Sequence, residues 1–219
     1  MATFTPFIEL QSDPPVRGFL HEPGAPGGHG LVLTHGAGSD ARAPLLEAVA
    51  DAFAAAEITV LRCDLPYRQA RPHGPPSPST AARDRAGLKC AVEALRARLP
   101  GSVFLGGHSY GGRQSSILVS GEPDLVAGLL LFSYPLHAPG RADLRTGHFP
   151  LLTTPTIFLH GTRDPFGSVE EMGAALKLLT GPHKLLIVEG AGHDLGGKRA
   201  AARVAGLALE EFRPWIQPG

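Results

Sequence analysis

The chain has 219 residues and carries 20 Lys and Arg against 20 Asp and Glu, so its formal net charge is zero. A chain of this length can fold around one hydrophobic core, and residues 1–219 are expected to form a single domain. The balanced charge and the lack of a basic block argue against nucleic acid as a partner.

The N-terminus and the apolar runs argue against export and against a membrane partner. Residues 1–6 lack the basic start and the long apolar stretch of a signal peptide. The most apolar run, residues 126–134, is far shorter than the roughly 20 residues that a membrane-spanning helix needs. A cytoplasmic location is therefore expected. Cys63 and Cys90 are the only cysteines, and both are predicted to be buried free thiols.

Short apolar runs alternate with longer helical patterns, which predicts a parallel sheet covered by helices. Residues 7–10 and 17–20 are candidate N-terminal strands. The other predicted strands are residues 31–35, 59–63, 103–106, 127–132, 156–160 and 184–188. The predicted helices are residues 44–56, 80–99, 110–120, 169–179 and 198–215. Residues 64–79 are too rich in Pro and Gly to predict regular structure.

A predicted strand and a predicted helix meet at Ser109, within Gly107-His108-Ser109-Tyr110-Gly111. This matches the G-x-S-x-G nucleophile elbow, in which a sharp turn exposes the serine hydroxyl above a sheet. The two glycines leave room for such a turn. The alternative is a glycine-rich turn with no catalytic role.

Two further polar residues each follow a predicted strand, and they are Asp164 and His193. Functional residues of open α/β sheets collect at the carboxyl ends of strands, so both are expected to lie near Ser109. The chain order Ser, Asp, His is that of α/β-hydrolases and differs from the orders of chymotrypsin and subtilisin. Asp194 is a poorer acid because it adjoins the base. As an alternative, Asp164 would cap the helix that begins near Ser168.

The glycine-rich segment 34–39 follows the first clear strand and is the expected source of one oxyanion donor. The backbone N–H groups of Ala37 and Tyr110 are the predicted oxyanion hole, with Gly38 as an alternative to Ala37 and a simple turn as the alternative to both. The predicted substrate-binding residues are Gly36, Gly38, Tyr67, Tyr134 and Phe166. Ordinary loop packing explains the aromatic residues equally well.

The other histidines of these motifs, His35, His108 and His160, are interpreted as hydrogen-bonding partners and not as catalysts or metal ligands. The sequence shows no spacing typical of a metal site, so neither a metal nor another cofactor is expected. Arg113 falls on the first turn of the helix after Ser109, where a solvated or ion-paired arginine is the default interpretation.

Four segments resemble the α/β-hydrolase superfamily: residues 106–113, 134–140, 161–167 and 193–195. They are most similar to a compact group of predicted bacterial hydrolases, related to the testis-expressed hydrolase-like proteins and to the hydrolase-like subunit of the nonspecific-lethal chromatin complex. Members of that group often carry Lys and Met where this chain has His108 and Tyr110. Dienelactone hydrolases are similar in size but use Cys in place of Ser109. The resemblance implies an α/β-hydrolase fold with a mostly parallel sheet and helices on both faces.

Together these features predict a serine hydrolase with Ser109 as nucleophile, His193 as general base and Asp164 as the acid that orients the base. Residues 133–155 are rich in Pro and Gly and leave room for little or no lid, which favours small or accessible esters or thioesters. The expected partner is thus a small-molecule ester. A peptidase or an acyltransferase would use the same triad. A non-catalytic scaffold, a role suggested for some eukaryotic relatives of the group, is the alternative from another class.

Overall fold

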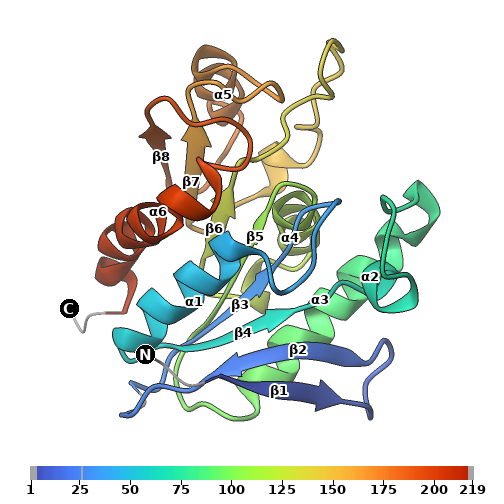
Figure 1. Cartoon of the computed structure of the whole chain (residues 1–219). Coiled ribbons are helices and arrows are strands. Elements are labelled where there is room, and N and C mark those ends of the chain that lie inside the picture. Colours follow the sequence, from blue (N-terminus) through green and yellow to red (C-terminus); the bar gives the residue numbers. More distant parts are fainter. Residues whose placement is uncertain (1–3, 26, 217–219) are drawn as a thin grey trace.

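The computed structural model of the protein describes residues 4–25 and 27–216. Its centre is an eight-stranded sheet with the strand order β1-β2-β4-β3-β5-β6-β7-β8 (Figure 1). β2 is antiparallel to both of its neighbours, and all other neighbouring strands are parallel. The strands are β1 (Phe4–Glu9), β2 (Val16–His21), β3 (Gly30–Thr34), β4 (Thr59–Cys63), β5 (Val103–His108), β6 (Leu129–Phe132), β7 (Thr156–Gly161) and β8 (His183–Val188). The predicted mostly parallel α/β sheet is confirmed.

Helices cover both faces of the sheet, as predicted (Figure 1). The helices are α1 (Pro44–Ala55), α2 (Pro66–Ala70), α3 (Ala81–Arg96), α4 (Tyr110–Gly121), α5 (Val169–Leu176) and α6 (Gly197–Phe212). α1 and α6 pack in the core on one face, where the rings of Phe53 and Phe212 lie 5.0 Å apart. Side chains of α3, α4 and α5 share the core on the opposite face.

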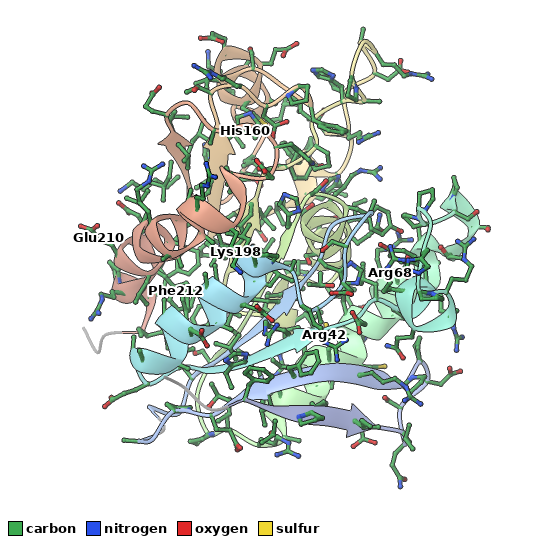
Figure 2. The ribbon with its side chains drawn as sticks, viewed as in Figure 1. Arg42, Arg68, His160, Lys198, Glu210 and Phe212 are labelled. Carbon is green, nitrogen blue, oxygen red and sulfur yellow. The ribbon has the colours of Figure 1, made fainter. Side chains whose placement is uncertain are left out.

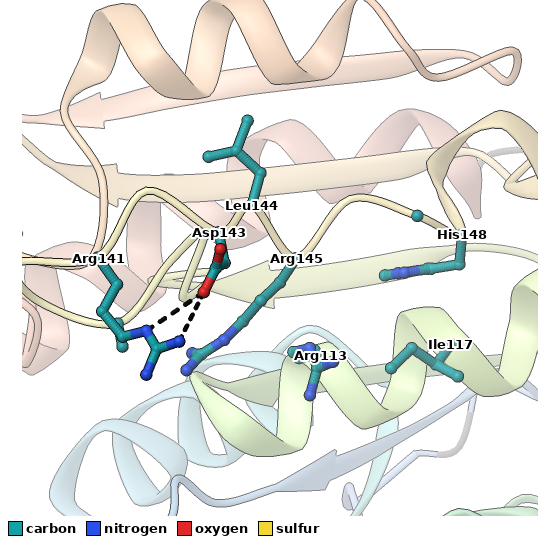
Figure 3. Close-up of a pocket in the computed structure, with 9 residues that line it drawn as sticks. Arg113, Ile117, Arg141, Asp143, Leu144, Arg145 and His148 are labelled. Atoms are coloured by element: carbon teal, nitrogen blue, oxygen red, sulfur yellow. Dashed lines mark hydrogen bonds and ion pairs between the residues drawn. The ribbon is translucent and has the colours of Figure 1, made fainter.

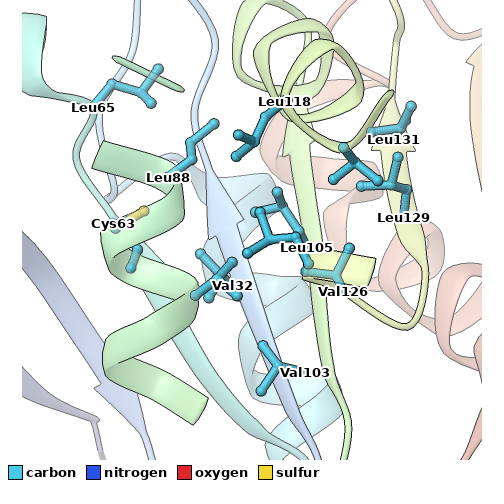
Figure 4. Packing of buried hydrophobic residues seen from close by; sticks show 14 of the residues in the cluster. Val32, Cys63, Leu65, Leu88, Val103, Leu105, Leu118, Val126, Leu129 and Leu131 are labelled. Atoms are coloured by element: carbon cyan, nitrogen blue, oxygen red, sulfur yellow. The ribbon is translucent and has the colours of Figure 1, made fainter. Parts of the chain in front are cut away.

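The alternation of side chains along β3 explains why the strand sequences are uninterrupted apolar runs. Leu31 and Leu33 are buried in the core of α1 and α6, whereas Val32 is buried in the core of α3 and α4. Successive strand residues point to opposite faces, so a strand covered on both faces needs apolar residues throughout. Figure 4 shows Val32 among side chains that include Leu88 of α3 and Leu118 of α4. Each such buried leucine contributes roughly 1.5–3 kcal/mol.

Predicted and observed elements differ mainly at their ends and in the segment 64–79. The helix predicted to end at residue 215 ends at Phe212 and is followed by a 3-10 turn, Arg213–Trp215. The segment predicted to be irregular contains α2. Pro66 occupies the first turn of α2, where its missing N–H has no intrahelical partner to lose. The next N–H, that of Tyr67, donates to the buried carboxylate of Asp84 at 3.0 Å, so a tertiary contact fixes this helix.

The parallel strands end at one edge of the sheet, where the loops after β3, β5, β7 and β8 come together. Residues 133–155, between β6 and β7, contain one 3-10 turn, Phe149–Leu151, and no α-helix. The prediction of little or no lid is therefore confirmed. The edge of the sheet that carries Ser109 is left without a helical cover from this segment.

Two other predictions concern the cysteines and the membrane. Cys63 is buried as predicted, but Cys90 is only half-buried, with its thiol 3.7 Å from the carbonyl oxygen of Asp13. Burial raises the pKa of the Cys63 thiol to about 12, so this side chain stays neutral. Across the described part of the chain, no helix combines the length and the apolar character needed to cross a bilayer. The cytoplasmic location stays a prediction.

Candidate active site

Ser109 occupies the sharp turn between β5 and α4, with φ 50° and ψ −114°. A positive φ is uncommon for a residue other than glycine and indicates local strain held by the surrounding structure. The flanking glycines are required by close backbone contacts. A Cβ on Gly107 would lie 2.8 Å from the nitrogen of Gly112, and one on Gly111 would lie 2.5 Å from the carbonyl oxygen of His35. The backbone at Ser109 therefore has the sharp turn that the G-x-S-x-G pattern predicts.

The structure brings together the three residues predicted to be catalytic. Nε2 of His193 lies 2.7 Å from Oγ of Ser109, and Nδ1 lies 2.8 Å and 3.0 Å from the two carboxylate oxygens of Asp164. The carboxylate can accept only from a protonated Nδ1, which leaves Nε2 free to accept the serine proton. The three side chains thus form one continuous hydrogen-bonded chain that starts from three different loops.

Asp164 is buried, and its side chain makes two kinds of hydrogen bond. Burial alone would raise its pKa, but the bonds from the ring of His193 and from the N–H of Phe166 outweigh that effect and lower it. The carboxylate therefore stays ionised beside the imidazole. The helix cap weighed as an alternative role belongs to Ser168, whose Oγ accepts from the N–H of Glu171 in a capping box. Asp164 does not cap α5.

His108 and His160 support this triad from below. Nε2 of His108 lies 2.8 Å from the carbonyl oxygen of His193, and burial lowers the pKa of His108 to about 4. The ring is therefore neutral and donates to that carbonyl, which fixes the loop that carries the base. His160 is fully buried beneath Asp164, and its Nε2 lies 2.7 Å from the carbonyl oxygen of Gly167. Both histidines hold loops, and among the described residues neither ring makes a hydrogen bond to Ser109.

The loop after β3 is oriented by hydrogen bonds to its carbonyl groups. The hydroxyl of Tyr67 donates to the carbonyl oxygens of Gly36 and Ala37 at 3.2 and 2.9 Å. In a trans peptide the N–H points opposite to the preceding carbonyl, so the N–H of Ala37 points away from Tyr67. In residues 4–25 and 27–216, the N–H groups of Ala37 and Tyr110 make no backbone hydrogen bond, and both residues line the cavity above Ser109. Both N–H groups are therefore free to act as the predicted oxyanion donors.

Arg68 of α2, labelled in Figure 2, ties the loop after β3 (residues 35–39, the oxyanion loop) to the Pro-rich segment that follows α2 (residues 71–78). This side chain is 8% exposed and donates only to carbonyl oxygens. Its five acceptors lie on Ala37, Ser39, Arg71, Pro72 and Gly74. One guanidinium therefore sets the relative positions of the oxyanion loop and of the Pro-rich segment.

Tyr110 is linked to α2 and α3 through the buried carboxylate of Asp84. The Tyr110 hydroxyl donates to Asp84 at 2.8 Å, while the other carboxylate oxygen accepts from the N–H of Tyr67. Burial, and then this bond to the carboxylate, raise the pKa of Tyr110. Asp84 was not predicted as a site residue, because an acidic residue on an amphipathic helix gives no signal that it is buried.

A cavity of about 520 Å³ opens on Ser109. Its lining residues are Ala37, Pro75, Pro76, Ser77, Pro78, Ala81, Arg85, Ser109, Tyr110, Arg113, Gln114, Ile117, Pro135, Arg145 and Phe166. Phe166, predicted to bind substrate, does line this cavity, and its ring stacks on that of His193 with centroids 4.1 Å apart. The contribution of the Pro-rich segment and of the arginines to the lining was not predicted, because it depends on how loops that are distant in the sequence pack together.

Four residues predicted to bind substrate lie elsewhere. Tyr134 is 1% exposed and donates to the carbonyl oxygen of Arg145 at 2.6 Å, so its hydroxyl points into the protein. Tyr67 is buried beneath the oxyanion loop that it orients. Gly36 faces His108, because a Cβ there would lie 2.8 Å from that ring, and Gly38 is absent from the cavity lining. Tyr134, Tyr67 and Gly36 are therefore corrected from substrate contacts to structural supports of the site. Gly38 is exposed beside Ala37, and its contact with substrate stays a prediction.

Comparison with known proteins places this chain in a family. The alpha/beta hydrolase domain family matches residues 28–211. A dienelactone hydrolase from Anabaena variabilis is 21% identical, with 99% of both chains covered and a TM-score of 0.77. An alpha-beta serine hydrolase homologue from Coxiella burnetii is 16% identical over 96% of this chain and 98% of its own, with a TM-score of 0.76.

A serine hydrolase without a lid from Xanthomonas campestris is also similar, at 16% identity and a TM-score of 0.74, over 99% of this chain and 96% of its own. At these identities the structural likeness concerns the fold. The closer resemblance to the testis-expressed group stays a prediction. The family match, which spans most of the sequence, shows that the chain belongs to the alpha/beta hydrolase domain family.

Proposed function

We propose that this protein is a serine hydrolase that cleaves small carboxylic esters or thioesters through an acyl-enzyme on Ser109. The observation that carries this proposal is the hydrogen-bonded chain from Ser109 through His193 to Asp164, with distances of 2.7 and 2.8 Å, at the floor of an open cavity. A merely structural serine would have no reason to lie in a strained turn with a base in hydrogen-bond contact.

The first step is attack of Oγ of Ser109 on the substrate carbonyl carbon while His193 takes the hydroxyl proton. Asp164 stabilises the imidazolium that forms. The carbonyl oxygen becomes an oxyanion between the N–H groups of Ala37 and Tyr110, each worth about 3 kcal/mol by comparison with measured oxyanion holes. The N-terminus of α4 adds a favourable dipole at the same place.

In the second half of the reaction, the bond between the acyl carbon and the leaving oxygen or sulfur breaks, and His193 returns the proton to that leaving group. Water then attacks the acyl-enzyme with His193 again as base, which releases the acid and restores Ser109. Every proton in this cycle passes through Nε2 of His193.

The cavity favours a small substrate. Its volume of about 520 Å³ falls in the range of roughly 300–1,000 Å³ found for small-molecule sites. The segment 133–155 provides no helical lid. A peptidase or acyltransferase would use the same groups, and product analysis with competing alcohols and amines separates these activities: transfer to alcohol in preference to water would favour an acyltransferase.

The proposal is tested by labelling with a fluorophosphonate probe and by turnover of short p-nitrophenyl esters. Wild type should label and turn over, and Ser109→Ala should do neither. Ser120→Ala is the matched control, because Ser120 lies at the far end of the same helix and donates to the carbonyl oxygen of Ile117. A wild-type protein that neither labels nor hydrolyses any ester would refute the proposal and favour the scaffold.

A further inference from the structure

The charged side chains that line the catalytic cavity are all positive. They are Arg85, Arg113 and Arg145, and no Asp or Glu is among the lining residues. The chain as a whole has equal numbers of acidic and basic residues, so this concentration is local. Clefts lined by charge of one sign raise the local concentration of ligands of the opposite sign.

Arg113 lies on α4, one turn after Ser109, and is half-buried. The ion pairs formed by the described residues do not include Arg113, so the ion-paired interpretation is wrong. Its Nε is buried and has no hydrogen-bond partner within residues 4–25 and 27–216, so this donor is not solvated either. A buried donor left without an acceptor is costly, which suggests that a ligand supplies the acceptor.

Arg145 faces the same space from the loop between β6 and β7 (Figure 3). Its guanidinium makes one long hydrogen bond, 3.4 Å, to the carbonyl oxygen of Pro135 and no ion pair in the part of the chain that the structure describes. Burial, and then the charge of Arg113, lower the pKa of Arg145. Two partly buried cations that repel each other are relieved when an anion binds between them.

The neighbouring groups do not supply that anion. Asp143, on the same loop, is already paired with Arg141 at 2.7 Å, as the dashed lines in Figure 3 show. His148 is kept neutral, because burial, and then the charge of Arg113, lower its pKa to about 4. Asp84 is buried behind Tyr110 and accepts from the hydroxyl of that residue.

Arg85 is a weaker candidate for anion binding than the other two arginines. It donates to the side-chain oxygen of Gln114 at 2.8 Å, so part of its guanidinium is already satisfied. Arg113 and Arg145 also line a second cavity of about 570 Å³, which shares them with the catalytic cavity. The guanidinium groups of Arg113 and Arg145, neither of which is in an ion pair among the described residues, therefore mark the place where the two cavities join.

We propose that Arg113 and Arg145 form a subsite for a carboxylate carried by the ester substrate. The guanidinium group presents paired N–H donors that match the two oxygens of a carboxylate. The preferred substrates are then half-esters of short dicarboxylic acids, or acyl esters of short hydroxy acids, rather than neutral esters. This inference rests on the proposed function, since the subsite and Ser109 line one cavity.

The kinetic test compares each acid with its neutral primary amide, which has nearly the same shape. The monomethyl esters of succinate, glutarate and adipate place the charge on the acyl side, and O-acetyl esters of 3-hydroxypropanoate and 4-hydroxybutanoate place it on the leaving side. In at least one pair, wild type should prefer the acid over the amide by about tenfold or more in kcat/KM, at fixed ionic strength. A ratio near one in every pair would overturn the inference.

Variants assign that preference to the two arginines. Arg113→Gln and Arg145→Gln should each reduce the acid-to-amide ratio about tenfold, and either variant suffices if the other fails to fold. Arg83→Gln is the control, because Arg83 is an exposed arginine that is paired with Asp13 at 2.8 Å and lines neither cavity, and it should leave the ratio unchanged. A ratio that survives both Arg113→Gln and Arg145→Gln would overturn the assignment.

A binding measurement separates this inference from the proposed function. Ser109→Ala retains the cavity, and calorimetric titration with the same acids and amides reports the subsite without chemistry. Tighter binding of an acid than of its amide, with no hydrolysis by wild type, would uphold the subsite and refute the hydrolase. Hydrolysis of neutral esters, with equal binding of acids and amides in every pair, would refute the subsite alone.

Discussion

The ring of Phe166 stacks on the imidazole of His193, with centroids 4.1 Å apart and planes inclined by 30°. The same residue donates its backbone N–H to Asp164 at 2.9 Å. Phe166 thus contacts the proposed base through its ring and the proposed acid through its backbone. The ring restricts the rotation of the imidazole, while the backbone fixes the carboxylate.

From this contact we expect Phe166→Ala to lower kcat about tenfold, since a loosely held base spends less time aligned with Ser109. The backbone bond to Asp164 survives the substitution, so the protein should fold. Steady-state kinetics with p-nitrophenyl acetate measure the effect. Leu144→Ala, at an exposed loop position, is the control. Unchanged kcat in Phe166→Ala would show that the stacking does not position His193.

The triad assigns different tasks to its two supporting residues. His193→Ala should lower kcat by at least as much as Asp164→Asn, because the base transfers the proton whereas the acid orients it. An Asp→Asn change at this place in a triad lowers kcat about 10⁴-fold in a well-studied case. Turnover of a p-nitrophenyl ester by both variants tests the order. Full activity in His193→Ala would show that another group is the base.

The contacts of Tyr67 make a specific prediction for the oxyanion loop. Tyr67→Phe removes the hydroxyl that holds the carbonyl groups of Gly36 and Ala37 and should lower kcat about tenfold. KM should change little, because Tyr67 does not line the cavity. Separate determination of kcat and KM decides this. A rise in KM with unchanged kcat would indicate a substrate contact instead.

Three histidines should make stability depend on pH. Burial lowers the pKa of His21, His108 and His148 from 6.5 to about 4. The unfolded chain therefore binds more protons than the folded chain between pH 4 and pH 6.5, so the free energy of unfolding rises with pH in that window. We expect urea denaturation to give a lower free energy at pH 5 than at pH 7.

The variant His108→Gln tests the contribution of one of these groups. The amide nitrogen of Gln reaches the position of Nε2 and can still donate to the carbonyl oxygen of His193 but does not titrate, so the difference in stability between pH 5 and pH 7 should become smaller. His183→Gln is the control, since His183 is exposed at the start of β8. An equal pH dependence in His108→Gln and wild type would mean that His108 has no lowered pKa.

The sheet and the elbow could be predicted because local rules determine them. Apolar runs buried on both faces and the glycines around Ser109 are visible in the sequence itself. α2 was missed because its start depends on a bond from Tyr67 to Asp84, which lies 17 positions away. Tyr134 was wrongly predicted to bind substrate, because the sequence around an aromatic loop residue does not show whether its side chain points into a cavity or into the core.

The pairing of Arg113 could not be predicted from the sequence. Its position one turn after Ser109 could be predicted, but whether an arginine pairs with a carboxylate depends on which loops lie beside it in the fold. Here the nearest acidic residue of the facing loop, Asp143, pairs with Arg141. Only the structure shows that Arg113 forms no ion pair with any acidic residue of the described part of the chain.

The hydrogen bonds of Arg68 have a consequence for changing the specificity of this site. The same guanidinium holds the carbonyl groups of the oxyanion loop and of the Pro-rich segment. The length of the Pro-rich segment and the position of the oxyanion donors are therefore coupled. Insertions or loop grafts in the Pro-rich segment, made to admit larger substrates, would also move the donors above Ser109 unless the acceptors on Pro72 and Gly74 are preserved.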